Sequence, residues 1–451
     1  MLDQAIEYYH SLLNPALAQE THEIMMSHLE DRHLRFGTVP VCRTLRPQFY
    51  DRPAWEYLQT RTALVLSAFA KMHAACMIDA DMRSQLDLEP FEEEMRCVDV
   101  DARITVPWSS SRLDAFYRVA DGYLQFVEYN AETPAGIGYG DVLTQMFMEL
   151  DVMHQFQERY QVYPTPGMPH LVKCLTDAYQ DWGGRDVPQI GIVDWVEVPT
   201  KNEHRIIAEQ FEKQGYKTVL CDPRELEYRD GKLWYEDFRI DLLYKRVLAT
   251  ELVHRLGMDS AVIRAVRDQA VFITNSFSAK LLAKKASLAF LSDENNEHLF
   301  TAHEVEAIHR HIPWTRRVQD RKTSYGQKQV DLLDFISDNR DRLVLKPNDE
   351  YGGAGVVIGW ETSQEEWEKT MRHALTTPFV VQERVEMVQR DFPMIVDGTL
   401  DISRRYVDAD PYVFGGQYVG SCLTRLSSAT LLNVTAGQGS VVPMFVIDRK
   451  A

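Results

Sequence analysis

Residues 343–356 read Leu-Val-Leu-Lys-Pro-Asn-Asp-Glu-Tyr-Gly-Gly-Ala-Gly-Val, an apolar strand that ends in a lysine and leads into a glycine-rich loop. Glycine has no Cβ atom, so backbone N–H groups in such a loop can approach phosphate oxygens closely. Lys346 would bring a positive charge to the same phosphates. The loop alone is equally compatible with an ordinary hairpin. It is not a Walker loop, because no Gly-Lys-Ser/Thr follows and no helix begins there.

A strand that carries oxygen ligands lies far upstream, at Phe126-Val127-Glu128-Tyr129-Asn130. Alternation along a strand points Glu128 and Asn130 to one face. Asp121-Gly122 predicts a hairpin turn to the preceding strand, which places Asp114 near Glu128. Because Mg²⁺ prefers oxygen ligands and shares them with phosphates, these three side chains indicate a metal site. The alternative is that each one simply lies on the solvent-exposed face of a sheet.

Length and composition limit the class of protein. The chain has 451 residues, 45% of them apolar and 26% charged, with a formal charge of −18. This predicts a globular protein of two or three packed lobes. An acidic surface repels phosphate backbones, so nucleic acid is not expected as a partner. The N-terminal residues lack a signal-peptide pattern, and no stretch reaches the roughly 20 apolar residues of a membrane span. The six cysteines are scattered, which is typical of reduced thiols, and we expect a cytoplasmic protein with no membrane association.

The hydrophobic periodicity changes along the chain. The first hundred residues have helical patterns, including 86–95, and the last sixty are rich in β-forming residues and glycine. Between these ends, the pattern at 190–220 predicts a strand, an amphipathic helix and a parallel strand. That unit resembles a Rossmann fold but lacks G-x-G-x-x-G, so it does not indicate a dinucleotide site. Further helices are expected at about 141–160, 261–291 and 304–311, and further strands at 343–359 and 379–385.

Some polar residues carry little information on their own. Lys284 and Lys285 lie in an expected helix, where lysines are usually solvated. Glu383, at the end of an expected strand, could accept a hydrogen bond from a ribose hydroxyl or lie at the surface. Arg425, Asn433 and the turn at 437–439 interrupt the β-rich tail, and alone they indicate no function.

Taken together, these segments resemble the ATP-grasp superfamily, and specifically its circularly permuted branch, which includes glutathionylspermidine synthetase and bacterial ATP-grasp proteins of unassigned substrate. The resemblance extends over residues 105–447. The segments that carry it are 112–114, 128–136, 241–246, 275–277 with Lys285, 311–315, 345–347, the glycine loop at 352–355, 381–385, and Asn433-Val434.

The resemblance implies an α+β protein with a circularly permuted ATP-grasp fold, in which two α/β lobes hold ATP between them. The implied ranges are 1–104 for a helical N-terminal region, 105–185 for the metal-binding part of the C-lobe, 186–260 for a Rossmann-like pre-ATP-grasp α/β subdomain, 261–390 for the nucleotide-binding lobe, and 391–451 for a C-terminal β segment that completes the C-lobe.

The resemblance also implies roles for individual residues. Two departures from the family pattern concern Lys284, where an asparagine often precedes the phosphate lysine, and Gln438, which replaces a glycine. Either Lys284 or Lys285 could therefore contact phosphate. The implied roles are Mg²⁺ binding by Asp114, Glu128 and Asn130; phosphate contacts by Lys285 and Lys346; a lid loop at Gly352, Gly353 and Gly355; an adenine and ribose pocket at Gln382, Glu383 and Val385; and charge neutralisation at the transferred phosphoryl group by Arg112 and Arg425.

The function implied by the resemblance is an ATP-dependent carboxylate–amine ligase that forms an amide or peptide bond through an acyl phosphate and releases ADP and phosphate. ATP and Mg²⁺ would be required, and the partners would be small carboxylates and amines such as amino acids, peptides or polyamines. Two alternatives are a kinase-like phosphotransferase, which would give a stable phosphorylated product, and a non-catalytic nucleotide-binding protein. The sequence does not indicate the acid, the amine or the oligomeric state.

Overall fold

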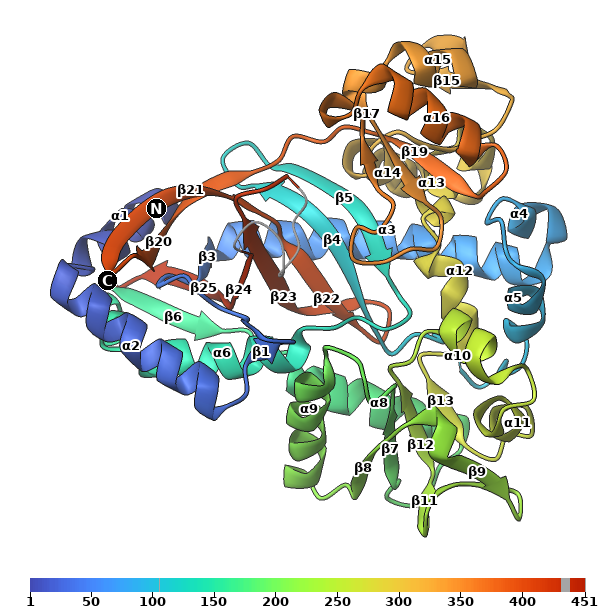
Figure 1. Ribbon diagram of the computed structural model, residues 1–451, viewed down its shortest axis with the longest axis horizontal. Helices are drawn as coiled ribbons and strands as arrows, with labels where there is room; N and C mark the ends of the chain where they lie inside the picture. Colours follow the sequence, from blue (N-terminus) through green and yellow to red (C-terminus); the bar gives the residue numbers. More distant parts are fainter. Residues whose placement is uncertain (105, 431–438, 451) are drawn as a thin grey trace.

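A computed structural model describes residues 1–104, 106–430 and 439–450 of this α+β protein. Its centre is a seven-stranded antiparallel sheet, here called the central sheet, with the order β20-β21-β23-β22-β4-β5 and with β24 paired to β23. An early hairpin and the late strands thus share one sheet, because β22 pairs with β4 with Tyr412 opposite Arg112 (Figure 1). The strands are β4 (Ser110–Arg118), β5 (Tyr123–Asn130), β20 (Gln389–Val396), β21 (Thr399–Val407), β22 (Asp410–Phe414), β23 (Tyr418–Ser427) and β24 (Ser440–Val442).

The predicted Asp-Gly hairpin is confirmed. Gly122 has a φ of +69°, the left-handed conformation that such a turn favours. The register places Asp114 opposite Glu128 and Arg112 opposite Asn130. All three expected oxygen-bearing residues, Asp114, Glu128 and Asn130, therefore lie at the same end of the hairpin.

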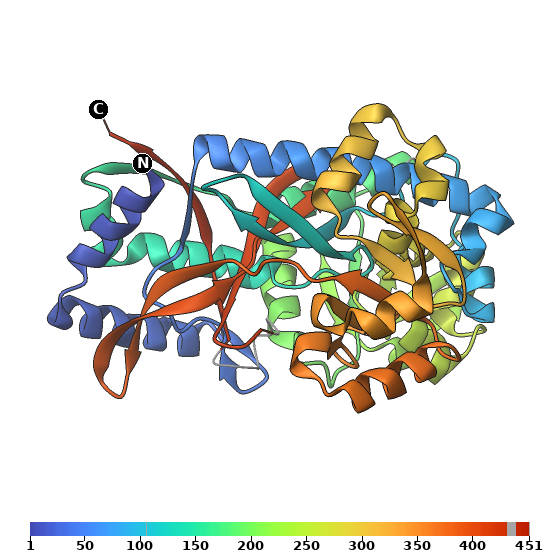
Figure 2. The same ribbon diagram turned by 90° about the horizontal axis from the view of Figure 1, so that it is seen from above.

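A long helix, α3 (Arg52–Ile78), covers one face of the central sheet (Figure 2). The Asp51 side chain caps its first turn by accepting from the Ala54 backbone N–H at 3.1 Å. Its buried face packs against β5, where the ring centroids of Phe69 and Tyr129 lie 4.5 Å apart. The neighbouring helices are α12 (Lys280–Ala283), α13 (Ala286–Ser292) and α14 (Ala302–His311).

A three-stranded sheet joins segments from three distant parts of the chain. Its order is β3-β25-β6, and β25 runs parallel to β3 and antiparallel to β6. Aromatic rings pack beneath it, including Phe49 stacked on Phe156 at 4.9 Å between centroids. The elements here are β3 (Gln48–Asp51), β25 (Met444–Arg449), β6 (Tyr160–Pro164), α1 (Leu2–Leu12), α2 (Pro15–Asp31), α6 (Ile137–Glu149), α7 (Asp151–Phe156), and the short pair β1 (Arg35–Phe36) and β2 (Val39–Pro40).

The predicted strand–helix–strand unit at 190–220 is confirmed, and it belongs to a four-stranded parallel sheet with the order β13-β12-β7-β8. The chain passes from β7 to β8 on one side and then returns to β12 on the other, so the strand order reverses between β7 and β12. The elements are β7 (Ile190–Val193), β8 (Thr218–Cys221), β12 (Leu242–Lys245), β13 (Phe272–Thr274), α8 (Met168–Trp182), α9 (Lys201–Lys213), α10 (Ala249–Leu256), α11 (Ala261–Arg267), and the small sheet of β9 (Leu226–Arg229), β10 (Lys232–Tyr235) and β11 (Phe238–Ile240).

The glycine loop at 352–355 connects two strands of a small antiparallel sheet with the order β14-β19-β17-β18, as the sequence predicts for 343–359 and 379–385. Leu345, Val381 and Trp367 are buried in its core. The elements are β14 (Thr315–Arg317), β17 (Leu343–Pro347), β18 (Val357–Ile358), β19 (Phe379–Glu383), α15 (Leu332–Asp338), α16 (Gln364–Ala374), and the hairpin of β15 (Lys322–Tyr325) and β16 (Lys328–Asp331).

Three helix predictions are wrong in part. The segment 261–291 is interrupted by β13, so the parallel sheet continues past residue 260. The segment 86–95 is helical only in α5 (Pro90–Met95), after the short α4 (Ala80–Ser84). The expected helix at 141–160 ends at α7, because Tyr160 begins β6. In the described ranges, no helix combines the length and apolar character of a membrane span.

Candidate functional site

A cavity of about 1060 Å³ lies where the central sheet, the parallel sheet and the small antiparallel sheet meet. The hairpin β4–β5 and the glycine loop both contribute to its lining, although they are far apart in the sequence. The structure therefore brings together the two segments that the sequence analysis singled out. The predicted site residues that line the cavity are Arg112, Asp114, Glu128, Asn130, Lys285, Lys346, Gly352, Gly353, Gln382, Glu383, Val385 and Arg425.

Gly355 does not line the cavity. It has a φ of +68°, and a Cβ atom there would lie 2.7 Å from Cγ of Pro347. Gly352 and Gly353 also have positive φ, at +64° and +81°. A Cβ atom on Gly352 would meet no atom within 4 Å, so its conformation, rather than a lack of space, favours glycine there. Gly355 instead lets the loop pack against the end of β17.

Asp114 forms ion pairs with two arginines. Its carboxylate accepts from Arg112 Nε at 2.7 Å, from Arg425 Nη2 at 2.7 Å and from Asn130 Nδ2 at 2.9 Å. Burial would raise the pKa of Asp114, but the charges of Arg112 and Arg425 lower it to about 2. Asp114 is thus held ionised.

Two buried carboxylates that the sequence analysis missed complete this arrangement. Arg425 Nε pairs with Asp408 at 2.7 Å, and Arg425 Nη2 pairs with Asp410 at 3.0 Å. Burial raises the pKa of both carboxyls, although Arg425 opposes the shift. We call this group the arginine cluster, and its members are Arg112, Arg425, Asp114, Asp408 and Asp410.

Glu128 and Lys285 form an ion pair across the cavity, with 3.0 Å between Glu128 Oε1 and Lys285 Nζ. Lys346 Nζ donates to Gln382 Oε1 at 2.6 Å and to the Val127 carbonyl at 3.2 Å. Burial lowers the pKa of Lys346 to about 8, although Glu128 opposes the shift. Lys346 thus donates to two uncharged oxygens and has Glu128 and Lys285 as charged neighbours.

Lys284 points to a different set of partners from Lys285. Its side chain is 2% exposed, and Nζ lies 2.7 Å from Glu92 and 3.2 Å from Asp349. Lys280 pairs with Asp349 at 2.6 Å and with Glu132 at 3.3 Å. This lysine cluster consists of Lys245, Lys280, Lys284, Glu92, Glu132 and Asp349. Of the two adjacent lysines, Lys285 is therefore the one that faces the predicted metal ligands.

Tyr325 and Arg342 are two residues that the sequence analysis missed at the other end of the small antiparallel sheet. The Tyr325 hydroxyl donates to Glu383 Oε1, and Arg342 Nη2 lies 3.3 Å from the same oxygen. Both side chains come from segments with no motif, so only the fold places them beside Glu383.

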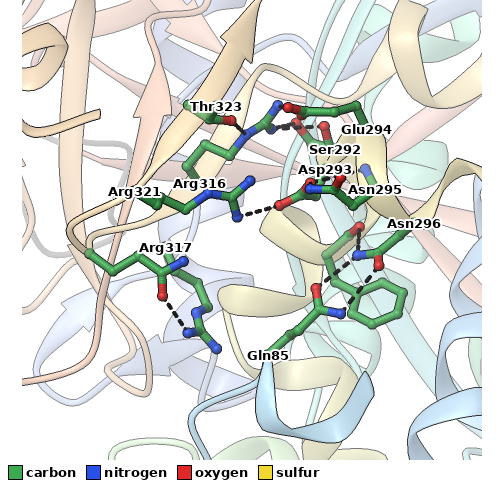
Figure 3. A network of polar contacts seen from close by, with 12 residues as sticks. Gln85, Ser292, Asp293, Glu294, Asn295, Asn296, Arg316, Arg317, Arg321 and Thr323 are labelled. Atoms are coloured by element: carbon green, nitrogen blue, oxygen red, sulfur yellow. Dashed lines mark hydrogen bonds and ion pairs between the residues drawn. The ribbon is translucent and has the colours of Figure 1, made fainter. Parts of the chain in front are cut away.

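A polar network fixes the hairpin that carries Tyr325 (Figure 3). Arg316 donates to Thr323 on β15 and to Glu294, at 2.7 Å in each case. Arg321 donates to Asp293 at 2.6 Å. These contacts hold the β15–β16 hairpin against the turn of 3-10 helix at Glu294–Leu299, and so hold Tyr325 next to Glu383.

The donor set at the β4–β5 end is chemically suited to Mg²⁺. Glu128, Asn130 and Asp114 supply carboxylate and amide oxygens, which are hard ligands. Among the described residues, no three or more His, Cys, Asp or Glu side chains form a group that could hold a metal ion. A magnesium ion here would therefore need the Asn130 amide and phosphate oxygens as ligands in addition to carboxylates.

The far end of the cavity reaches the carboxyl ends of β7 and β12. Asp194 follows β7 and Arg246 follows β12, and both line the cavity together with Glu203 of α9 and Glu251 of α10. We call these four residues the parallel-sheet crevice. Arg246 belongs to the segment 241–246 that carries the family resemblance, whereas no sequence pattern indicated the three carboxylates. Asn433 and residues 437–438 lie outside the described residues.

Comparisons with known proteins identify the family of this chain. The family model described as "Circularly permuted ATP-grasp type 2" matches residues 88–427. A "Putative glutamate--cysteine ligase 2-2" of Frankia casuarinae (strain DSM 45818 / CECT 9043 / HFP020203 / CcI3) is 24% identical over 338 residues, which cover 71% of this chain and 36% of that protein. The chain thus spans about a third of the length of that relative. An uncharacterized protein of Mycobacterium tuberculosis (strain ATCC 25618 / H37Rv) is 22% identical over 309 residues, covering 64% of this chain and 50% of that protein.

Among solved structures, a glutathione synthetase-like effector from Globodera pallida in its apo form aligns with a TM-score of 0.62 and 11% sequence identity. The alignment covers 96% of this chain and 98% of that chain. At this identity the likeness concerns the fold.

Proposed function

The chain belongs to the circularly permuted ATP-grasp type 2 family, and from this premise we propose that it is an ATP-dependent ligase that joins a small carboxylate to an amine. The observation that carries the proposal is that Glu128 pairs with Lys285 in the same cavity that Lys346 and the glycine loop line. Oxygen ligands for a cation and two lysines for phosphates thus share one space. A relative named as a glutamate–cysteine ligase favours amino acids or peptides as substrates.

In the first step of the proposed reaction, an oxygen of the substrate carboxylate attacks the γ-phosphorus of ATP. The bond between that phosphorus and the oxygen bridging to ADP breaks, and ADP leaves with the electron pair. Lys346 and Lys285 would stabilise the charge on the phosphates, because phosphoryl transfer depends chiefly on positioning and electrostatics. Arg112 and Arg425, oriented by Asp114, would stabilise the phosphoryl group in transfer.

In the second step, the amine nitrogen attacks the carbonyl carbon of the acyl phosphate. The new C–N bond forms, the C–O bond to phosphate breaks, and the nitrogen releases a proton. The glycine loop would close over the site and keep water from the acyl phosphate. Residues Gln382, Glu383 and Val385 would hold the adenine and ribose, with Tyr325 and Arg342 orienting Glu383.

A magnesium ion, when bound, would supply positive charge that offsets the charge of the phosphates. Glu128 and Asn130 would hold it directly. Asp114 would contribute an oxygen while remaining the partner of Arg112 and Arg425.

The test combines a substrate screen with one substitution. Purified protein is incubated with Mg·ATP and with pairs drawn from amino acids, small peptides and polyamines, and ADP release is measured while mass spectrometry identifies the product. We expect an amide product for at least one pair. In Glu128→Gln, turnover should be lost while the circular dichroism spectrum is unchanged.

Two outcomes would contradict the proposal. A phosphorylated acid that accumulates as the stable product, with no amide formed, would identify a phosphotransferase. Turnover that is equal in Glu128→Gln and in the wild type would remove Glu128 from the metal site.

A further inference from the structure

The parallel-sheet crevice lies where a ligand site is expected from topology alone. In open parallel sheets, ligands bind outside the carboxyl ends of the strands, at the point where the strand order reverses. Here the order reverses between β7 and β12. Asp194 immediately follows β7 and Arg246 immediately follows β12, and both line the cavity. The crevice and the predicted phosphate site are therefore two ends of one continuous space.

Glu203 leaves one carboxylate oxygen without a partner in this crevice. Its side chain is almost completely buried, since the residue is 1% exposed. Oε1 accepts from the backbone N–H groups of Gly136 at 2.7 Å and Gly138 at 3.1 Å, whereas Oε2 has no hydrogen-bond partner among the described residues. Burial raises the pKa of Glu203, as expected for a carboxylate that has lost its hydration. Glu203 thus lines the cavity while one of its buried carboxylate oxygens lacks a partner, and an unpaired buried carboxylate oxygen is suited to accept from a ligand.

The arginine in the crevice is already engaged elsewhere. Arg246 Nη1 donates to the Pro134 carbonyl at 2.7 Å and to the Tyr244 hydroxyl at 3.3 Å, and Nη2 lies 3.4 Å from the Thr133 carbonyl. The guanidinium group of Arg246 therefore fixes the loop at 133–135. The crevice thus contains one guanidinium group, that of Arg246, and three carboxylates, those of Asp194, Glu203 and Glu251. The crevice therefore carries an excess of negative charge and favours a cationic ligand over an anionic one.

The same loop connects the crevice to the arginine cluster. The Ala135 carbonyl accepts from Arg112 Nη1 at 2.8 Å and from the Tyr412 hydroxyl at 2.6 Å. One residue earlier, the Pro134 carbonyl accepts from Arg246. A ligand in the crevice would thus be separated by the backbone of residues 134–135 from Arg112, one of the two arginines that are proposed to stabilise the phosphoryl group in transfer.

The crevice also contacts the glycine loop. Glu251 accepts from Trp195 Nε1 at 2.7 Å and from the Tyr351 hydroxyl at 3.3 Å. Tyr351 begins the loop, so the loop already reaches the crevice in this structure.

We propose that the parallel-sheet crevice binds the amine substrate as an alkylammonium ion, with Glu203 and Asp194 as its carboxylate partners, and that one of these carboxylates takes a proton from the nitrogen to give the neutral amine that attacks the acyl phosphate. The inference rests on the proposed ligase function and adds the chemical class of the second substrate and the residues that select it. Glu203 supplies an acceptor with an unpaired oxygen, and Asp194 supplies a second carboxylate near Arg246. A neutral or anionic nucleophile of the same size is disfavoured by the excess of carboxylates.

The test is a calorimetric titration of the full-length protein with 1,4-diaminobutane as the probe, in the presence of Mg²⁺ and a non-hydrolysable ATP analogue. Two matched probes are 1,4-butanediol, which has the same length without charge, and glutarate, which carries two negative charges. We expect the diamine to bind and the other two not to bind. Glu203→Gln and Asp194→Asn should each weaken diamine binding at least tenfold.

Glu203→Gln keeps an oxygen that can accept from Gly136 and Gly138, and Asp194→Asn keeps an acceptor for the Trp195 backbone N–H, so both variants retain the local hydrogen bonds. The control is Glu149→Gln, an exposed carboxylate on α6 remote from the crevice, and it should leave the diamine affinity unchanged. Equal diamine affinity in Glu203→Gln, Asp194→Asn and the wild type would overturn the inference, as would glutarate binding more tightly than the diamine.

The design separates this inference from the proposed function. Titration of the ATP analogue without amine reports on the phosphate site alone. Failure of the analogue to bind, with crevice-dependent diamine binding intact, would overturn the ligase proposal and support the crevice as an ammonium site. Normal binding of the analogue, with diamine binding insensitive to both crevice variants, would overturn the crevice and leave the ligase proposal standing.

Discussion

Two buried ionic clusters line the same cavity, and they differ in charge balance. The lysine cluster has three lysines and three carboxylates, whereas the arginine cluster has two arginines and three carboxylates. In the lysine cluster, Lys280 and Lys245 lower the pKa of Glu132 to about 2, although burial opposes the shift. In the arginine cluster, burial raises the pKa of Asp408 and Asp410. Each cluster also holds one carboxyl that shifts the other way, since burial raises the pKa of Glu92 and the charges of Arg112 and Arg425 lower the pKa of Asp114. The surplus carboxylate of the arginine cluster therefore lies at Asp408 and Asp410, not at Asp114.

The two clusters also differ in where their members come from. The lysine cluster connects α5, β12, α12 and the loop after β17, so it holds separate parts of the molecule together. The members of the arginine cluster come from or adjoin β4, β22 and β23, which are all in the central sheet. We infer that the lysine cluster is mainly structural and that the arginine cluster is the one whose charge responds to ligands.

The largest expected effect concerns Arg425, which contacts three carboxylates. Arg425→Met should lower the free energy of unfolding by about 5 kcal/mol, because it leaves buried carboxylates without a counter-charge. Urea unfolding followed by circular dichroism measures the loss. The control is Arg404→Met, which removes an exposed partner of Asp391 and should cost less than about 1 kcal/mol. Equal losses in the two variants would contradict the view that the arginine cluster is held together by Arg425.

A somewhat smaller effect is expected in the lysine cluster. Lys284→Met should lower the free energy of unfolding by about 3 kcal/mol, because Glu92 and Asp349 lose a partner. The double variant Lys284→Met, Glu92→Gln leaves two lysines with two carboxylates, and it should recover most of the loss. A double variant that is less stable than Lys284→Met would show that charge balance does not govern this cluster.

Lys346 belongs to neither cluster, so its removal should affect binding more than folding. Lys346→Ala should raise the Kd for Mg·ATP by about 10- to 150-fold, equivalent to about 1.5–3 kcal/mol, because a charged contact in a partly desolvated site is lost. Fluorescence titration with a nucleotide analogue measures the change. Lys369→Ala, on the exposed face of α16, serves as the control and should bind normally. An unchanged Kd in Lys346→Ala would exclude Lys346 from the phosphate site.

The smallest expected effect concerns Asp410, which belongs to the cluster with more carboxylates than arginines. It is a pH dependence of the free energy of unfolding. The folded-state pKa of Asp410 is raised above its ordinary value of 3.8, so the folded state binds more protons than the unfolded state above that pH. Stability should therefore fall as the pH rises from about 4 through the folded-state pKa. Asp410→Asn should remove this fall and be about 1 kcal/mol more stable than the wild type at pH 7.

Urea unfolding at pH 5, 6, 7 and 8 checks this prediction, with Asp391→Asn as an exposed control. Asparagine at 410 can still accept from the Ala115 backbone N–H, so the local hydrogen bond is kept. A parallel pH dependence in Asp410→Asn and the wild type would indicate that Asp410 does not carry the surplus charge.

Local patterns predicted the strands that carry the site. Alternation and the Asp121-Gly122 turn correctly placed Asp114 and Glu128 on paired strands. The exact register was not predictable from the turn, because four residues, 119–122, join the strands and a register shift between Asp114 and Ala115 brings Asp114 opposite Glu128. The strand–loop–strand at 343–359 followed from its apolar runs and glycines in the same way. That both segments line one cavity required the family resemblance, since no local signal links them.

The missed features depend on tertiary contacts. Glu203 lies on an amphipathic helix and looks solvent-exposed in the sequence, yet it caps the start of α6 at Gly136 and Gly138. The strand β13 has three residues and lies between apolar helices, so its periodicity is too short to detect. Asp408 and Asp410 are two residues apart at the connection between β21 and β22, and the spacing argument used for Glu128 and Asn130 could have found them.

The pairing of β22 with β4 has a consequence for synthesis on the ribosome. Ser111 pairs with Val413, so about 300 residues must be made before the edge of β4 is covered. At about 5–20 residues per second, that edge stays open for roughly 15–60 s. During this interval the nascent hairpin exposes unpaired backbone beside Asp114, to which a strand of another chain could pair. Slow codons placed between these two strands would lengthen the exposure and lower the yield of folded protein.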